Sequence, residues 1–457
     1  MSDFRDDTIK NQSRGREERA EEVARLLEEG RPGSLSRYLK DKAPEDIAEI
    51  LGEFSLDEKL VIFNGLSAEN AAVVLDDTDP QTRLQLLQKL DSKRLAEVLE
   101  EMPVDEAADI IEDAPEDERE DLLDLMGRED AEEVEEILSY PEDSAARVMN
   151  PEFVTVREYS PVEDAVQHLR NLELEEDIFY IYVTDKQDRL KGIVPVTKLV
   201  TARSGTRIDE IMDKEVRYVV ANEDQEQAAN IMKKYDIFSL PVVDADEKLI
   251  GRITADDIID VMDEERGEDI SKMTGTIEEE QGTESVIQAT KNRLPWLVTC
   301  MLGSIVTGLV IRMFEVTLAE TIALVSFIPV ITATGGNSGV QASTVVVREI
   351  ALGHMDMGKV GEEVWRQFRV AAGLGIVCGT VLTGIADFWM KSSAVGTIVG
   401  LSILLVVVWS NFVGVMIPVI FKKLRIDPAI SSGPLITTLN DVIGVFIYLS
   451  VASFFLK

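Results

Sequence analysis

The sequence has very few residues that bind transition metals or form cross-links. Among its 457 residues there are two histidines, His168 and His354, and two cysteines, Cys300 and Cys378. A zinc site of the usual His and Cys ligands is therefore excluded, and both cysteines lie in the apolar half of the chain, where they cannot cross-link the other half. No P-loop, G-x-S-x-G or metal-hydrolase motif is present, so an enzyme is the weakest function class.

Basic residues are scarce in the first two thirds of the chain. Residues 291–457 carry 12 Lys and Arg against 9 Asp and Glu, so residues 1–290 hold −42 of a total formal charge of −39. Such an acidic surface repels nucleic acid, which needs a basic partner. The N-terminus, MSDFRDDTIK, lacks the apolar stretch of a secretory signal, and we expect residues 1–290 to be cytosolic.

Five apolar stretches follow residue 290, and each has roughly the ~20 residues that span a bilayer. They cover residues 294–314, 318–335, 370–390, 394–421 and 434–456. Nine Lys and Arg fall on the side that carries the N-terminal half, against three on the other side. The positive-inside rule therefore predicts a multi-pass protein of the cell membrane with a cytoplasmic N-terminal half and an extracytoplasmic C-terminus.

Two polar features interrupt these stretches. Asp441 lies in the fifth stretch, where a carboxylate is costly and normally faces a water-filled path or an ion-pair partner; the stretches contain almost no base that could pair with it. The run TGGNSGVQAST, residues 334–344, places glycines and Asn337 in the second stretch. We expect non-helical backbone lining an aqueous path here, with a re-entrant turn or a small-residue packing face as the alternatives.

The acidic half contains two internal repeats. PEDIAEIL, AENAAVVL and SKRLAEVL begin at residues 44, 68 and 92, and this 24-residue period, with turns at Pro44, Pro80, Pro103 and Pro115, predicts an α-solenoid. Residues 149–262 hold two copies of a strand, a helix and two strands joined by an Asp-rich turn. The second pattern resembles a tandem pair of CBS domains.

Many CBS domains hold a nucleotide ribose with a Ser/Thr-x-x-Asp turn after the last strand. The second repeat has Thr254 and Asp257 at this spacing, but the first has Pro195 and Lys198. A nucleotide site, to which we assign Tyr180, Thr254 and Asp257, is thus supported on one side only.

Carboxylates then follow one another along a predicted helix that leads toward the first span. Asp257, Asp260, Glu264 and Glu268 are three or four residues apart and share one helix face, where like charges destabilise the helix unless cations or a basic partner neutralise them. A cation sensor coupled to the membrane region is one interpretation. A merely solvated acidic face, or the general surface acidity of a protein from a high-salt organism, is the other.

Together these parts resemble the MgtE family of magnesium channels over nearly the whole chain. The most specific residues are TGGNSGVQ, the run DPAISSGPLITTLND from Asp427 to Asp441, and GEDI from Gly267 to Ile270. Val340 stands where family members often have Asn. The resemblance implies a homodimer with the pore on its axis. It leaves open whether ATP binds as a second ligand.

The resemblance also implies roles for individual residues. Asp441 would select the ion, and Gly433, Thr437 and Asn337 would line the same pore. Regulatory Mg²⁺ would bind acidic positions of the cytosolic region. These are Asp105, Asp109, Asp224, Glu226, Asp236, Asp257, Asp260, Glu264, Glu268 and Asp269.

The predicted fold is a multidomain membrane protein that combines an α-solenoid, an α/β CBS pair, a connecting helix and an all-α membrane domain. The predicted boundaries are a flexible N-terminus at 1–20, a solenoid at 21–140, a CBS pair at 141–262, a connecting helix at 263–290 and a membrane domain at 291–457. The predicted function is Mg²⁺-selective entry into the cytosol, closed by cytosolic Mg²⁺. A CBS-regulated exchanger of divalent cation for Na⁺ or H⁺ and a membrane-anchored nucleotide sensor are the alternatives.

Overall fold

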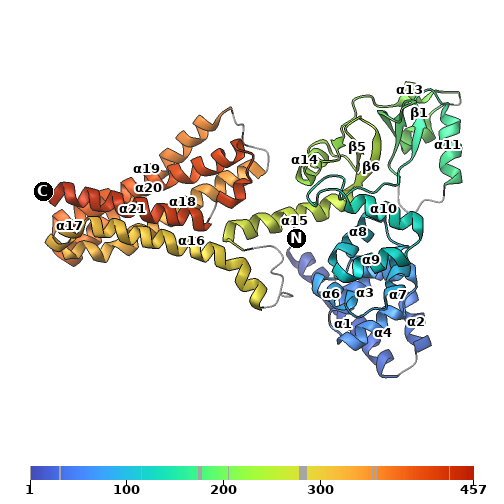
Figure 1. Cartoon of the computed structure of the whole chain (residues 1–457), viewed down its shortest axis with the longest axis horizontal. Coiled ribbons are helices and arrows are strands. Elements are labelled where there is room, and N and C mark those ends of the chain that lie inside the picture. The colour runs from blue at the N-terminus through green and yellow to red at the C-terminus, as the bar shows by residue number, and fades with distance from the viewer. Residues whose placement is uncertain are drawn as a thin grey trace. The chain divides into compact units, whose positions relative to one another are not determined.

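The computed structural model of the chain divides into two compact units, residues 1–263 and 264–457, which are described separately below. The structure describes residues 2–29, 32–114, 116–172, 178–203, 205–276, 286–351, 355, 358–431 and 433–456. Figure 1 shows the helices and strands of both units.

The first unit begins with a series of short helices set at a strict interval. After α1 (Ser2–Glu28), nine helices start twelve residues apart, from residue 32 to residue 128. They are α2 (Pro32–Lys40), α3 (Pro44–Leu51), α4 (Leu56–Asn64), α5 (Ala68–Asp76), α6 (Pro80–Leu87), α7 (Ser92–Leu99), α8 (Val104–Asp113), α9 (Glu116–Leu125) and α10 (Arg128–Leu138). The structure confirms the predicted solenoid, and the 24-residue repeat is a pair of these twelve-residue units.

Residues that start helices recur at the same interval. Ser55 and Glu58 form a capping box at α4, Ser67 accepts from the Asn70 amide at α5, and Asp79 accepts from the Thr82 amide at α6. Side chains of this kind satisfy amides that a helix N-terminus leaves unpaired. Pro115, predicted at another turn, lies outside the described residues.

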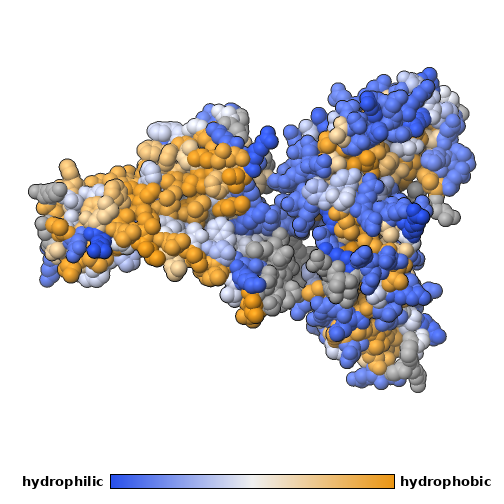
Figure 2. Space-filling view, viewed as in Figure 1, coloured by the Kyte–Doolittle hydropathy of each residue, from blue (hydrophilic) through white to orange (hydrophobic). Residues whose placement is uncertain are grey.

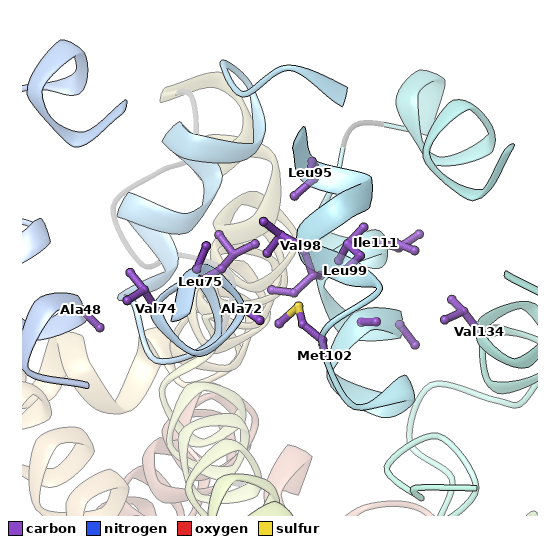
Figure 3. Packing of buried hydrophobic residues seen from close by; sticks show 14 of the residues in the cluster. Ala48, Ala72, Val74, Leu75, Leu95, Val98, Leu99, Met102, Ile111 and Val134 are labelled. Atoms are coloured by element: carbon purple, nitrogen blue, oxygen red, sulfur yellow. The ribbon is translucent and has the colours of Figure 1, made fainter. Parts of the chain in front are cut away.

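Alternate helices of the series pack side by side. The helix α3 contacts α5, α5 contacts α7, and α7 contacts α9. Figure 3 shows Leu75 of α5 beside Val98 and Leu99 of α7, whereas Val74 lies on the side of α5 nearer Ala48 of α3; all five side chains are buried. Residues 2–20, predicted as a flexible N-terminus, have helical backbone in α1, and their flexibility stays a prediction.

Two α/β repeats complete the first unit. The first contains β1 (Thr155–Arg157), α11 (Val162–Asn171), β2 (Tyr180–Thr184), β3 (Leu190–Pro195), α12 (Val196–Thr201) and α13 (Ile208–Ile211). The second contains β4 (Val219–Val220), α14 (Gln225–Tyr235), β5 (Ser239–Val243) and β6 (Leu249–Thr254). In each, the first strand is parallel to the second and the second is antiparallel to the third, so the two copies of the internal repeat share one topology.

The equivalent glycines of the two repeats admit a neighbouring chain segment. A Cβ on Gly192 would come within 2.8 Å of the Asp213 carbonyl oxygen, and one on Gly251 within 2.6 Å of the Met149 sulfur. The repeats also meet directly through Tyr182 and Ser239, whose hydroxyl oxygens are 2.7 Å apart.

The helix α15 (Ala255–Thr274) follows the last strand and continues past the division between the units. Its first part belongs to the first unit and its second part, from Glu264, to the second. Of the predicted connecting helix at 263–290, residues 277–285 lie outside the described residues.

Within the part of the second unit that the structure describes, five helices are long and apolar enough to cross a membrane, which agrees with the predicted number. Its elements are α16 (Val286–Met313), α17 (Glu315–Glu320), η1 (Ile322–Phe327), α18 (Ile328–Ala351), α19 (Val360–Met390), α20 (Ser393–Lys423), η2 (Pro428–Ser431) and α21 (Gly433–Leu456). The helix α20 lies at the centre, because α18, α19 and α21 all pack against it. Figure 2 shows apolar residues across the visible surface of this bundle and mainly polar residues on the first unit.

We expect Leu99→Ala to destabilise the solenoid by about 2–5 kcal/mol, because it leaves a cavity at a residue that is 1% exposed. Urea unfolding of a fragment spanning residues 1–276, followed by circular dichroism, measures the change. The control is Val61→Ala, at a residue that is 51% exposed. Equal midpoints for the two variants would contradict the packing described here.

Candidate ion path and cytosolic acidic sites

The predicted pore residues follow one another along α21. Gly433, Thr437 and Asp441 are four residues apart, so they lie on roughly one stripe of the helix, and all three are half-buried. The Thr437 hydroxyl donates to the carbonyl oxygens of Gly433 (2.9 Å) and Pro434 (3.1 Å). Asp441 is the one charged residue of α21.

The glycine-rich run of α18 packs against this helix and against α20. A Cβ on Gly339 would lie 2.3 Å from Asn440 Nδ2, and one on Gly335 would lie 2.7 Å from Val406 Cγ1. A Cβ on Gly336 would contact the Thr437 methyl group at 3.4 Å. The small residues therefore let three helices approach one another closely.

The expectation of non-helical backbone in this run is wrong. Residues 334–344 are helical throughout, and the second span reaches from Ile322 to Ala351 instead of ending near 335. The physical reason is the packing: the glycines remove side chains at the helix contacts, so the run forms a small-residue packing face. The pore-lining role of Asn337 stays a prediction. Asn337 follows Gly336 on α18 and is exposed in the single chain.

Polar side chains are buried where these helices meet, and the sequence analysis missed them. Asn440 is fully buried, and its side-chain amide has no hydrogen-bond partner among the described residues. Asn411 of α20 donates to the Ser338 hydroxyl of α18. In the sequence, these residues could have been found as polar residues in the middle of predicted spans. Because Asn440 points into the bundle, the next residue, Asp441, is turned about 100° away from it.

In the first unit, Asp257 has a local structural role. Its carboxylate accepts from the Thr254 amide (2.7 Å) and from the Thr254 hydroxyl (2.6 Å), which forms a cap at the start of α15. The pair predicted to hold a ribose therefore also caps the helix. Tyr180, the third residue assigned to the nucleotide site, begins β2 in the other repeat.

Asp257 and Asp260 face acids of the solenoid that the sequence analysis did not single out. Burial raises the pKa of Asp76 above its ordinary value, and the carboxylates of Asp260 and Asp257 raise it further, while Arg83 lowers it. Burial also raises the pKa of Asp260, with the largest added contribution from Asp256. The end of α5 and the start of α15 thus carry opposed negative charges, with Arg83 between them.

The predicted acids Asp105 and Asp109 lie on α8. Arg147, which is 4% exposed, reaches Asp109 at 3.7 Å and also pairs with Glu112. Asp105 is buried on the same helix. The ion pairs of Arg147 therefore link helix α8 of the solenoid to the segment that leads into the α/β repeats.

Asp224, Glu226 and Asp236 lie at the two ends of α14. Asp224 caps the helix by accepting from the Glu226 amide at 2.9 Å, and Asp236 ends it in a left-handed conformation with φ of 52°. Asp224 and Glu226 therefore belong to the same helix start, where the Gln225 amide donates to the Asp143 carbonyl oxygen at 2.9 Å.

The last predicted acids, Glu264, Glu268 and Asp269, lie on the second part of α15. Glu268 pairs with Lys272, whose Nζ also donates to Asp427 Oδ2 at 2.8 Å. Burial raises the pKa of Asp269, and the neighbouring Asp427 carboxylate raises it further. Among the described residues, no three His, Cys, Asp or Glu side chains form a group that could hold a metal ion.

Comparison with known families covers most of the chain. The family models that match are described as "Divalent cation transporter" over residues 328–451, "MgtE intracellular N domain" over 42–143 and "CBS domain" over 145–205 and 208–264. The magnesium transporter MgtE of Thermus thermophilus is 38% identical over 331 residues, which is 71% of this chain and 73% of that protein. The chain belongs to the MgtE family of magnesium transporters. MgtE of Bacillus subtilis is 33% identical over 71% of this chain and 72% of that protein.

Solved structures resemble the soluble part. The cytosolic domain of the Mg²⁺ channel MgtE in complex with ATP superposes with a TM-score of 0.51 at 36% identity, over 53% of this chain and 99% of that chain. The soluble part of a magnesium transporter gives 0.50 at 27% identity, over 55% and 99%. The predicted family and fold class are confirmed, and MgtE proteins are transporters, not enzymes.

The opposed acids of α5 and α15 predict a pH dependence. Folding raises the pKa values of Asp76 and Asp260, so protonation of these carboxyl groups adds to the free energy of unfolding. This contribution is complete below about pH 4 and is lost as pH rises through the raised pKa values. Without divalent ions, we expect the melting temperature of residues 1–276 to fall less between pH 4 and 7.5 in Asp76→Asn/Asp260→Asn than in the wild type. Glu132→Gln/Glu135→Gln, on the exposed face of α10, is the control. Parallel pH profiles for all three proteins would refute the repulsion.

Proposed function

We propose that the chain is a Mg²⁺-selective channel that admits Mg²⁺ to the cytosol and is closed by Mg²⁺ bound to its acidic cytosolic region. The observation that carries the proposal is Asp441, the one charged residue of α21. It is half-buried and follows Thr437 by one helical turn and Gly433 by two. A membrane carboxylate without a base on its own helix attracts a cation. We propose a homodimer, in which two Asp441 side chains and Asn337 of each copy face one path.

The side chains of this path suit a hydrated ion. Mg²⁺ binds oxygen ligands in octahedral geometry and releases water slowly, so a channel that stripped its waters would conduct poorly. One carboxylate and one hydroxyl per subunit can hold the hydrated ion through its waters without chelating it. The inside-negative membrane potential then supplies about 2.3 kcal/mol per charge for each 100 mV.

The feedback follows from the acidic residues of the cytosolic region. At low Mg²⁺, the carboxylates of α5 and α15 repel one another across Arg83, and bridging ions would relieve this repulsion at high Mg²⁺. Asp105, Asp109, Asp224, Glu226, Asp236, Glu264, Glu268 and Asp269 complete the proposed set of regulatory acids. Since α15 continues into the unit that contains the membrane helices, ion binding that orders the first turns of α15 acts on the channel through the helix itself.

The domain boundaries, the orientation and nucleotide binding belong to the same proposal. The solenoid at 21–140, the repeats at 141–262 and the connecting helix at 263–290 are cytosolic, and the C-terminus of 291–457 lies outside the cell. The ATP complex of the related cytosolic domain supports ATP binding near Tyr180, Thr254 and Asp257. Here a ribose would have to share the Asp257 carboxylate with its Thr254 cap.

We expect Asp441→Ala to reduce Mg²⁺ uptake by more than about tenfold, because it removes the charge that draws the ion into the path. Uptake into Mg²⁺-starved cells and currents in membrane patches measure the effect. Asp387→Asn is the matched control, since Asp387 lies on α19 against Gly396 of α20 and should leave uptake unchanged. Wild-type uptake by Asp441→Ala rules out the pore assignment, and wild-type currents that do not reverse at the Mg²⁺ equilibrium potential indicate exchange for Na⁺ or H⁺.

Neutralising Asp257, Asp260, Glu264 and Glu268 together, as Asn and Gln, should weaken inhibition by cytosolic Mg²⁺ without lowering permeation. Loss of repulsion favours closure by about 0.2–0.5 kcal/mol per pair, whereas regulatory coupling is typically 1–3 kcal/mol. The loss of ligands should therefore dominate, and inhibition should require about tenfold more Mg²⁺.

The control neutralises four exposed acids of α10, namely Glu129, Glu132, Glu135 and Glu136. Inside-out patches with stepped cytosolic Mg²⁺ give both inhibition curves. Equal shifts in the two variants would show a general charge effect, and an unchanged curve in the α15 variant would leave its acidic face merely solvated.

A further inference from the structure

Near the end of α15, a basic side chain binds the segment that leads into the pore helix α21. Lys272 Nζ donates to Asp427 Oδ2 at 2.8 Å and also contacts the Glu268 carboxylate one turn earlier. The other oxygen of Asp427 accepts from the Ala429 amide at 2.8 Å, which fixes the carboxylate at the start of η2. The lysine thus joins two segments 155 residues apart.

Close backbone contacts surround this ion pair. A Cβ on Gly433, the first residue of α21, would lie 2.7 Å from the Met273 carbonyl oxygen. Gly275 has a φ of +76° and packs against Pro434 and Trp296, with 3.1 Å and 3.3 Å to an added Cβ. The joint therefore has little room for a larger side chain, and it lies two helical turns before Asp441.

The joint carries more negative than positive charge. Glu268, Asp269 and Asp427 face one another across it, and Lys272 is the base that contacts two of the three. Without its ammonium group, three carboxylates would repel one another in a partly buried space, where such repulsion is stronger than in water. Lys272 therefore occupies the place that a free cation would otherwise have to fill.

We propose that Lys272 is a positioning residue whose ammonium group keeps the end of α15 docked on the start of α21 without any divalent ion. This inference rests on the proposed function and deepens its regulation. Under this inference Glu268 and Asp269 belong to a permanent coupling and leave the proposed set of Mg²⁺-binding regulatory acids. Ions bound to the acids farther up α15 then displace a helix whose last part moves with the pore helix. The division of the chain at Asp263/Glu264 agrees with this, because the last part of α15 groups with the membrane helices.

Hydrogen exchange of the full-length protein in lipid nanodiscs tests the coupling without requiring transport. In EDTA, amides of residues 264–274 should exchange slowly in the wild type and about tenfold faster in Lys272→Gln, since a charge-assisted bond is lost. Mg²⁺ should slow the exchange in Lys272→Gln and leave the wild type nearly unchanged, because only the variant offers an uncompensated acidic site. Lys272→Arg should behave as the wild type.

Two further variants separate the ion pair from a general loss of charge or fold. Asp427→Asn retains an oxygen for the Ala429 amide and should match Lys272→Gln, and the double variant should be no worse than either single variant. Lys423→Gln removes an exposed base at the end of α20 and should leave the exchange unchanged.

Patch recordings add the functional result. Inhibition of Lys272→Gln should require several-fold more cytosolic Mg²⁺, with full current at low Mg²⁺. Equal exchange of wild type and Lys272→Gln in EDTA, or a large Mg²⁺-induced slowing in the wild type, overturns the proposal. A wild-type protein that conducts no Mg²⁺ would instead defeat the proposed function, while the exchange result would still stand.

Discussion

Repulsion among carboxylates is the constraint on which the cytosolic architecture depends. Residues 1–290 carry a formal charge of −42, yet the structure brings acids of different helices together instead of spreading them apart. Basic side chains lie near the places where these acids meet: the charge of Arg83 acts on both Asp76 of α5 and Asp260 of α15, and Arg147 pairs with Asp109 of α8. Each holds part of the structure together, and the charge that remains is available to mobile cations.

The membrane unit depends on a different constraint, the close approach of helices that contain glycine. Gly339 leaves the space that Asn440 fills, and Gly414 brings α20 against the Gly339 carbonyl oxygen. The close fit of Asn440 against Gly339 resists rotation of α21, because a turn of the helix would bring other side chains into a space that only the glycine leaves open. The orientation of the neighbouring Asp441 is therefore set by the packing of the adjacent face of α21, which carries Asn440.

Periodicity in the sequence predicted the fold well. The solenoid, the paired α/β repeats and five spans all follow from spacing and apolar length, since each depends on contacts between residues close in sequence. The prediction of non-helical backbone in the polar run of α18 was wrong. Glycine tends to break helices in water, but this tendency does not apply where glycine allows helices to touch. Neither the ion pair of Lys272 with Asp427 nor the closeness of Asp76 to Asp260 could be predicted, since both arise only from the tertiary arrangement. The Thr254 and Asp257 spacing was recognised, but spacing alone does not separate a helix cap from a ribose site.

The twelve-residue interval between helix starts has a consequence for how the solenoid folds and changes in evolution. Each helix packs chiefly on the helix two positions along the chain, so its contacts span only about two repeats. Contacts this local favour fast folding, and the energy of the array is close to a sum over neighbouring units. The gain or loss of a helix pair at the N-terminal end would then alter the length of the array while leaving the packing at α8, next to the α/β repeats, unchanged.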